Sequence, residues 1–117
     1  MLSSGYSFTQ NILSEIQVPA KGILSHTLYN DEQVKIILFG FAAGEELTAH
    51  TAPMPAIIQI LNGEVTLILG PDSREAAPGG LAYMAPQLTH GIVAKTPALV
   101  LLTLLKAARQ DPKPESV

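Results

Sequence analysis

Turn-forming residues divide this chain at short, even intervals, and this spacing limits the fold more than any other feature. Nine glycines and nine prolines occur among the 117 residues, and the stretches between them are rich in Val, Ile and Leu. Asn62-Gly63 separates two such stretches, and Asn-Gly is the strongest short-range signal for a β-hairpin. Only Asn11–Gln17 places apolar residues at helical spacing. The pattern predicts an all-β fold, built as a sandwich or a barrel.

The predicted strands end where turn residues occur. Because side chains alternate between the two faces of a strand, Val34, Ile36 and Leu38 are expected to share the face toward the interior. The opposite, outer face would then carry Phe39 and Phe41. We expect strands at Gly22–Tyr29, Gln33–Ala42, Leu47–Thr51, Ala56–Leu61, Glu64–Leu69, Leu81–Met84, Ile92–Lys95 and Leu99–Lys106.

The length of the chain is that of one domain. We predict an N-terminal arm over residues 1–20, a barrel over residues 21–106 and a flexible C-terminal tail over residues 107–117. Pro112 and Pro114 lie in that tail and disfavour regular structure there.

Composition and charge argue against several classes of function. The formal net charge is −3 and the seven Lys and Arg residues are scattered, which argues against nucleic-acid binding. The longest apolar runs, Ile36–Ala43 and Ala98–Leu105, are far shorter than the roughly 20 residues of a membrane span. Cysteine is absent, so disulfides, thiolate zinc sites and a cysteine nucleophile are excluded. The first residues lack a signal-peptide pattern, and we expect a cytoplasmic protein.

Two of the three histidines are expected among aliphatic side chains. Alternation places His50 on the same face as Ala56 and Ile58, unless a bulge intervenes near the prolines that follow it. His90 begins another predicted strand, and Ile92 shares its face. An imidazole on an apolar, inward face is either held by main-chain and water hydrogen bonds or available to a ligand.

Two segments resemble the conserved motifs of the cupin superfamily. Gly44–Gly63 is similar to the first motif, which runs glycine, five residues, His-x-His, three or four residues, glutamate, six residues, glycine. Gly79–His90 is similar to the second motif, in which glycine leads to Pro-x-Gly-x-x-His. The resemblance covers about Ile23 to Lys106. It implies an all-β jelly-roll (double-stranded β-helix) barrel made of two sheets.

In cupins the two motifs place three histidines and a glutamate around one divalent metal. Residue by residue, the resemblance implies that His50 and His90 are metal ligands here. The two other ligand positions fall on Ala52 and Ala56, whose methyl groups cannot donate an electron pair. Half of the usual ligand set is therefore missing.

Two alternatives follow for the metal. Either one divalent ion (Zn, Mn, Fe or Ni) is held by the two histidines with water or a substitute ligand, or the site has no metal. The candidates for an additional ligand are Gln59, if a bulge turns it inward, His26, Tyr83 and, for a soft metal, Met54. The second motif also departs from its pattern at Gln87, which stands where cupins have glycine.

The resemblance implies a small-molecule-binding cupin, and two functions remain open. One is metal-assisted chemistry on a small organic substrate; the other is a non-catalytic ligand-binding or sensor barrel with a degenerate, metal-free site. The sequence does not decide whether the protein is an enzyme. The pocket is expected to contain His50, Met54, Ala56, Ile58, Tyr83, His90 and Ile92.

The predicted outer faces are apolar, and this pattern favours self-association. Ile57 and Leu61 lie on the face opposite His50, and Phe39 and Phe41 were placed on an outer face above. A small barrel cannot cover all of this surface by itself. We therefore predict a homodimer, packed sheet to sheet, with the N-terminal arm able to cross to the partner.

Overall fold

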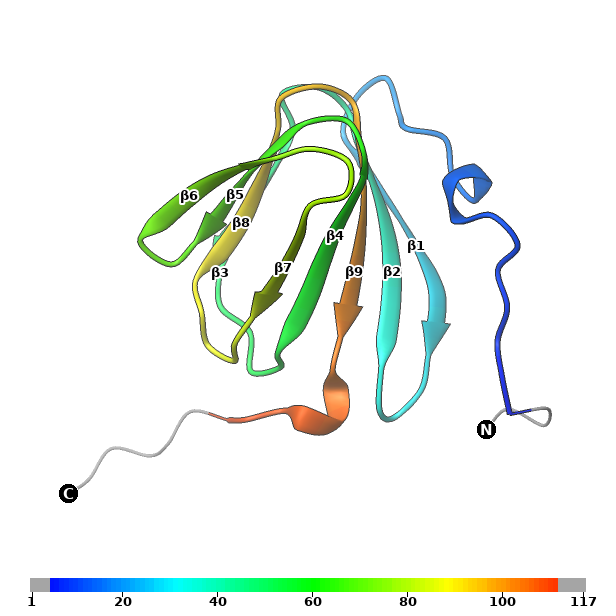
Figure 1. The fold of residues 1–117 in the computed structure, drawn as a ribbon, viewed down its shortest axis with the longest axis vertical. Coiled ribbons are helices and arrows are strands. Elements are labelled where there is room, and N and C mark those ends of the chain that lie inside the picture. The colour runs from blue at the N-terminus through cyan, green and yellow to red at the C-terminus, as the bar shows by residue number, and fades with distance from the viewer. Residues whose placement is uncertain (1–4, 112–117) are drawn as a thin grey trace.

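The computed structural model describes residues 5–111, and almost all of its regular structure is β-strand (Figure 1). The strands are β1 (Ile23–Asn30), β2 (Lys35–Phe41), β3 (Glu46–His50), β4 (Ala56–Asn62), β5 (Val65–Leu69), β6 (Asp72–Ala76), β7 (Leu81–Met84), β8 (His90–Ala94) and β9 (Ala98–Leu104). One sheet has the order β1-β2-β9-β4-β7 and the other the order β3-β8-β5-β6. Neighbouring strands pair antiparallel, so the predicted all-β jelly-roll is confirmed.

Two elements differ from the sequence predictions. The helix expected at Asn11–Gln17 is only the short 3-10 helix η1 (Ile12–Ser14), which begins where the Asn11 side chain accepts a hydrogen bond from the Leu13 N–H. Strand β6 was not predicted at all. Its residues are mostly exposed and polar, and it pairs with β5 alone at the edge of its sheet. Main-chain pairing therefore forms this strand without an apolar face to indicate it.

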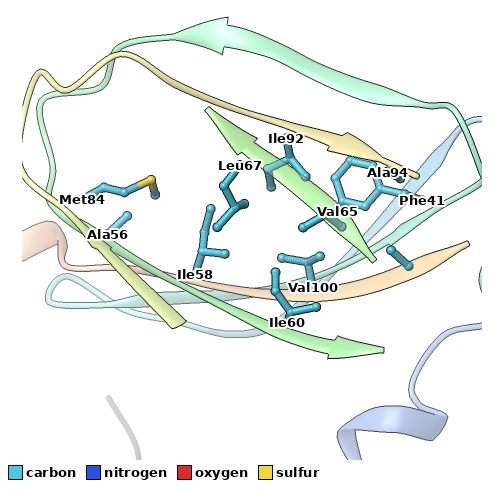
Figure 2. Packing of buried hydrophobic residues seen from close by; sticks show 11 residues of the cluster. Phe41, Ala56, Ile58, Ile60, Val65, Leu67, Met84, Ile92, Ala94 and Val100 are labelled. Carbon is cyan, nitrogen blue, oxygen red and sulfur yellow. The ribbon is translucent and has the colours of Figure 1, made fainter. Parts of the chain in front are cut away.

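The core lies between the two sheets (Figure 2). Strand β4 shows the alternation most clearly, because Ala56, Ile58 and Ile60 are buried while the residues between them are only partly buried. Val100 lies beside them on the neighbouring strand β9 of the same sheet, and Val65 of β5 belongs to the opposite sheet of the same core. Complete burial of one such aliphatic side chain stabilises the fold by about 1.5–3 kcal/mol. This packing determines which face of each strand points toward the interior.

The orientation predicted for β2 is wrong. Phe41 belongs to the buried core and Phe39 packs against it, so these side chains point inward. Leu38 lies on the outer face, yet it is 0% exposed. The chain's own N-terminal arm packs on this face of β2. A Cβ added to Gly40, on the same outer face, would lie 3.1 Å from Ile16 Cδ1. Both faces of β2 are therefore buried, one by the core and one by the arm.

The segment after β9 is tied to the loops at one end of the barrel. It contains the 3-10 helix η2 (Lys106–Ala108), and Lys106 Nζ donates to Asn30 Oδ1 over 2.9 Å. Further on, the Gln110 N–H donates to the Pro53 carbonyl over 2.7 Å. Residues 112–117 of the predicted tail lie outside the described residues, and the flexibility of the tail stays a prediction. No helix in the described part of the chain is long and apolar enough to cross a membrane.

Candidate functional site

A cavity of about 290 Å³ opens at the end of the barrel where β3 ends and where β4 and β8 begin. Its walls come from both sheets, and apolar side chains form most of them. The lining residues are Phe39, Leu47, His50, Ala52, Met54, Ala56, Ile58, His90, Gly91, Ile92, Leu102 and Leu104. A cavity of this size lies near the lower limit of the range, about 300–1,000 Å³, that is usual for small-molecule sites.

The cavity brings together every residue expected in the pocket except Tyr83. Strand β7 turns Met84 inward, where it is 1% exposed, and turns Tyr83 outward, where it is 60% exposed. Tyr83 is thus on the outer face of the sheet, and the prediction that it lines the pocket is corrected. Phe39 was missed because β2 was expected to face the other way. Leu102 and Leu104 were missed although alternation along β9 was available as a signal.

A β-bulge in β3 brings His50 to the mouth of the cavity, where its side chain is exposed to solvent. Leu47 pairs with Ile92 and His50 pairs with His90, so β3 spans three residue steps against two on β8. The extra residue changes the alternation, and Leu47 and His50 can therefore both line the cavity. Gly91 makes room for the bulge, since a Cβ there would lie 2.9 Å from the Leu47 carbonyl oxygen. A glycine in β8 thus positions a histidine in β3.

His50 and His90 form a pair, with ring centroids 4.5 Å apart and ring planes at 56°. Nδ1 of His50 lies 3.0 Å from the Thr48 carbonyl oxygen, and Nδ1 of His90 lies 2.9 Å from the Leu88 carbonyl oxygen. A carbonyl oxygen only accepts, so Nδ1 carries the hydrogen in both neutral rings. The lone pair is then on Nε2. The two main-chain contacts assign the same tautomer to both rings.

The residues present do not match the four-ligand metal centre that the motifs imply. Ala52 and Ala56 line the cavity together with both histidines, so the positions of the missing ligands lie beside them. Within the described residues no group of three or more His, Cys, Asp or Glu side chains could hold a metal. The site therefore offers two imidazole ligands, arranged as metal-binding histidines usually are, and no carboxylate.

Of the candidates for an additional ligand, Met54 lines the cavity, whereas Gln59 and His26 lie elsewhere. Gln59 lies on the outer face of β4, beside the N-terminal arm. The register shift between β4 and β9 comes after it, between Ile60 and Asn62, so this bulge does not turn Gln59 inward. His26 Nε2 lies 3.9 Å from a Glu15 carboxylate oxygen of the arm. Neither residue lines the cavity, so both are corrected as candidate ligands.

Gln87 holds two loops of the cavity rim together. Its φ is +68°, the left-handed conformation that the glycine of the second cupin motif would adopt without strain. The Gln87 N–H donates to the Ala52 carbonyl over 2.8 Å, and its side-chain Nε2 donates to the Gln110 carbonyl over 2.9 Å. The loop thus keeps a glycine-like backbone, and its side chain adds a contact to the C-terminal segment.

Two ionisable pairs outside the cavity have shifted pKa values. The Tyr29 hydroxyl donates to Asp31 Oδ2 over 2.7 Å, which lowers the pKa of the Asp31 carboxyl and raises that of the Tyr29 phenol. Lys95 lies 2.7 Å from Glu75, which lowers the pKa of the carboxyl and raises that of the amine. Asp31 also accepts from the Val34 N–H, so this carboxylate closes the β1–β2 turn.

Two packed antiparallel sheets with an apolar pocket at one end define this protein as a small jelly-roll barrel. Solved cupin structures share this architecture. An RmlC-like cupin from Desulfovibrio desulfuricans is 25% identical, with a TM-score of 0.77, over 86% of this chain and 98% of that one. A cupin superfamily protein from Desulfitobacterium hafniense is 22% identical, with a TM-score of 0.78, over 85% and 94%. The chain therefore has the cupin fold.

A conserved protein of unknown function from Streptococcus pyogenes is also similar. It is 22% identical, with a TM-score of 0.78, and the match covers 95% of this chain and 91% of that chain. No protein-family model and no curated protein matches the sequence.

Proposed function

We propose that this protein binds a small, largely apolar organic molecule in the cavity, in contact with His50 and His90. The observation that carries this proposal is the composition of the walls. Of the described residues that line the cavity, the two histidines are the only ones with polar side chains. An apolar site with a few convergent polar groups is the usual form of a small-molecule pocket.

The non-catalytic, metal-free reading is the one we favour. The two imidazoles are the only groups of the described lining that could transfer a proton, and no carboxylate lines the cavity beside them to orient them or to stabilise a charge. The two missing ligand positions are occupied by Ala52 and Ala56. We therefore propose a binding or sensor barrel, with the ligand itself as the partner.

A second candidate is supported by the tautomer of the histidine pair. Both Nε2 atoms carry a lone pair, which is the arrangement of two metal ligands. A divalent ion such as Zn²⁺, Mn²⁺, Fe²⁺ or Ni²⁺ would be held by these two atoms and completed by water. Two imidazoles hold such an ion far less tightly than three imidazoles and a carboxylate.

Metal titration followed by thermal unfolding tests this candidate. With Zn²⁺ in excess we expect a rise of about 1 kcal/mol in the free energy of unfolding, or roughly 4 °C in Tm. His50→Ala should remove the rise, because one imidazole alone binds weakly. His26→Ala is the matched control, since His26 lies outside the cavity and should leave the response unchanged. An equal response in all three proteins would place the metal elsewhere.

We also propose that the protein is a homodimer. Large apolar side chains remain exposed on the N-terminal arm and on the outer face of the larger sheet, although the arm covers part of that face in its own chain. They are Tyr6, Phe8, Leu13, Leu24, Leu81 and Tyr83. Light scattering at micromolar concentration should give about twice the chain mass of 12.4 kDa. A particle of one chain mass would contradict the proposal.

A further inference from the structure

We infer that the ligand of this cavity is an uncharged alcohol or phenol, bound with its hydroxyl group donating to the histidine pair. This inference rests on the proposed small-molecule function and adds the chemical class of the ligand. Two observations carry it, the direction of the hydrogen bonds at the two rings and the absence of charged residues from the described lining of the cavity.

The first observation is that main-chain carbonyl groups already occupy the Nδ1 atom of each imidazole ring. Nδ1 of His50 donates to the Thr48 carbonyl and Nδ1 of His90 donates to the Leu88 carbonyl. A neutral imidazole has one donor and one acceptor, so Nε2 of each ring can only accept. The cavity therefore offers a ligand two acceptor atoms on rings whose centroids are 4.5 Å apart. The polar end of a matching ligand must donate.

The second observation limits the charge of the ligand. No acidic residue and no Lys or Arg belongs to the described lining of the cavity. Moving a charged group from water into an apolar site is unfavourable unless an opposite charge meets it there. A carboxylate ligand would also bring a second set of acceptors toward the Nε2 lone pairs. Uncharged hydroxyl groups satisfy both conditions, because they donate one hydrogen bond and carry no charge.

The apolar walls of the cavity determine the chemical character of the rest of the ligand. Phe39, Ile58 and Leu102 also line the cavity, and their apolar side chains favour contact with a hydrocarbon body. A cavity of about 290 Å³ accommodates a molecule smaller than a typical drug, such as a compound with one or two rings. The ligand class is thus a compact hydrocarbon with one or two hydroxyl groups, since each of the two Nε2 atoms can accept one hydrogen bond.

Phenol and toluene provide a matched test, because they differ by a hydroxyl in place of a methyl group. Binding is measured by calorimetry with the full chain, treated with a chelator so that no metal occupies the Nε2 atoms, at about pH 8, above the range where free imidazole titrates. We expect phenol to bind more tightly than toluene, and benzoate to bind more weakly than phenol. Because phenol has one hydroxyl hydrogen to donate, its preference over toluene should fall about three- to tenfold in at least one of His50→Phe and His90→Phe, which keep an aromatic ring without nitrogens.

Nitrogen NMR of the imidazoles gives a second readout, which does not depend on any ligand. The inference requires the Nδ1–H tautomer in both rings of the free protein. The Nε2–H tautomer in either ring would overturn it, because that ring would then offer a donor.

The outcomes separate this inference from the proposed function. If toluene binds as tightly as phenol, or benzoate binds more tightly, the hydroxyl class is wrong while the small-molecule pocket stands. An unchanged preference in both Phe variants would likewise reject a role for the two rings. If phenol, toluene and benzoate all fail to bind, the proposed function fails together with the inference.

Discussion

A variant with Ala52→His and Ala56→Glu is expected to bind Zn²⁺ or Mn²⁺ tightly, although the parent chain does so weakly at best. Both alanines line the cavity beside His50 and His90, so the double variant would supply three imidazoles and a carboxylate to one space. Ala56 is only 3% exposed, so the new glutamate should destabilise the metal-free variant. Metal at about 1,000 times its Kd should then raise the free energy of unfolding by about 4 kcal/mol, measured as Tm against metal concentration.

The strand alternation of β4 supplies a matched control for this variant. Ala52→His combined with Gln59→Glu places the carboxylate on the same strand but on its outer face. This control should not bind metal more tightly than Ala52→His alone. A double variant that remains folded without gaining metal affinity would mean that the motif positions do not converge on the histidine pair.

Gly63→Ala is expected to be among the most destabilising substitutions in the barrel. Gly63 has φ +79°, and a Cβ there would lie 2.1 Å from the Pro97 carbonyl oxygen and 2.7 Å from Ala98 Cα. The alanine would carry the left-handed backbone cost of about 1–2 kcal/mol and would also force two main-chain segments apart. We expect a loss of more than about 4 kcal/mol in urea unfolding, or failure to fold.

Gly44→Ala separates the cost of the left-handed backbone from the cost of the steric clash. Gly44 also has a left-handed backbone, with φ +84°, but a Cβ there would meet nothing within 4 Å. We expect Gly44→Ala to cost only the backbone contribution, about 1–2 kcal/mol. If the two variants are equally destabilised, the close approach of Pro97 and Ala98 to the β4–β5 turn is not what makes Gly63 necessary.

Much of the candidate site could be predicted because its residues belong to spaced motifs. His50, His90, Ala52 and Ala56 line the cavity as the cupin pattern implies. Tyr83 and Gln59 could not be assigned in the same way. Alternation already put Gln59 on the face of β4 opposite Ala56 and Ile58, and only a bulge could have turned it inward. In β7 both faces carry apolar residues, so the sequence does not indicate which face turns inward. The bulge between Leu47 and His50 was likewise invisible, because it depends on Gly91 of the neighbouring strand.

The sequence by itself determined the positions of the turns, the strands between them and the two motif histidines. These features are local, because a turn such as Asn62-Gly63 follows from the backbone preferences of its own residues. Tertiary structure decided which face of each strand became the interior. In β2, Phe39 faces the core and Leu38 faces the arm, and both are hydrophobic. Burial free energy depends on the area removed from water and has no direction, so only the surrounding segments could sort one face from the other.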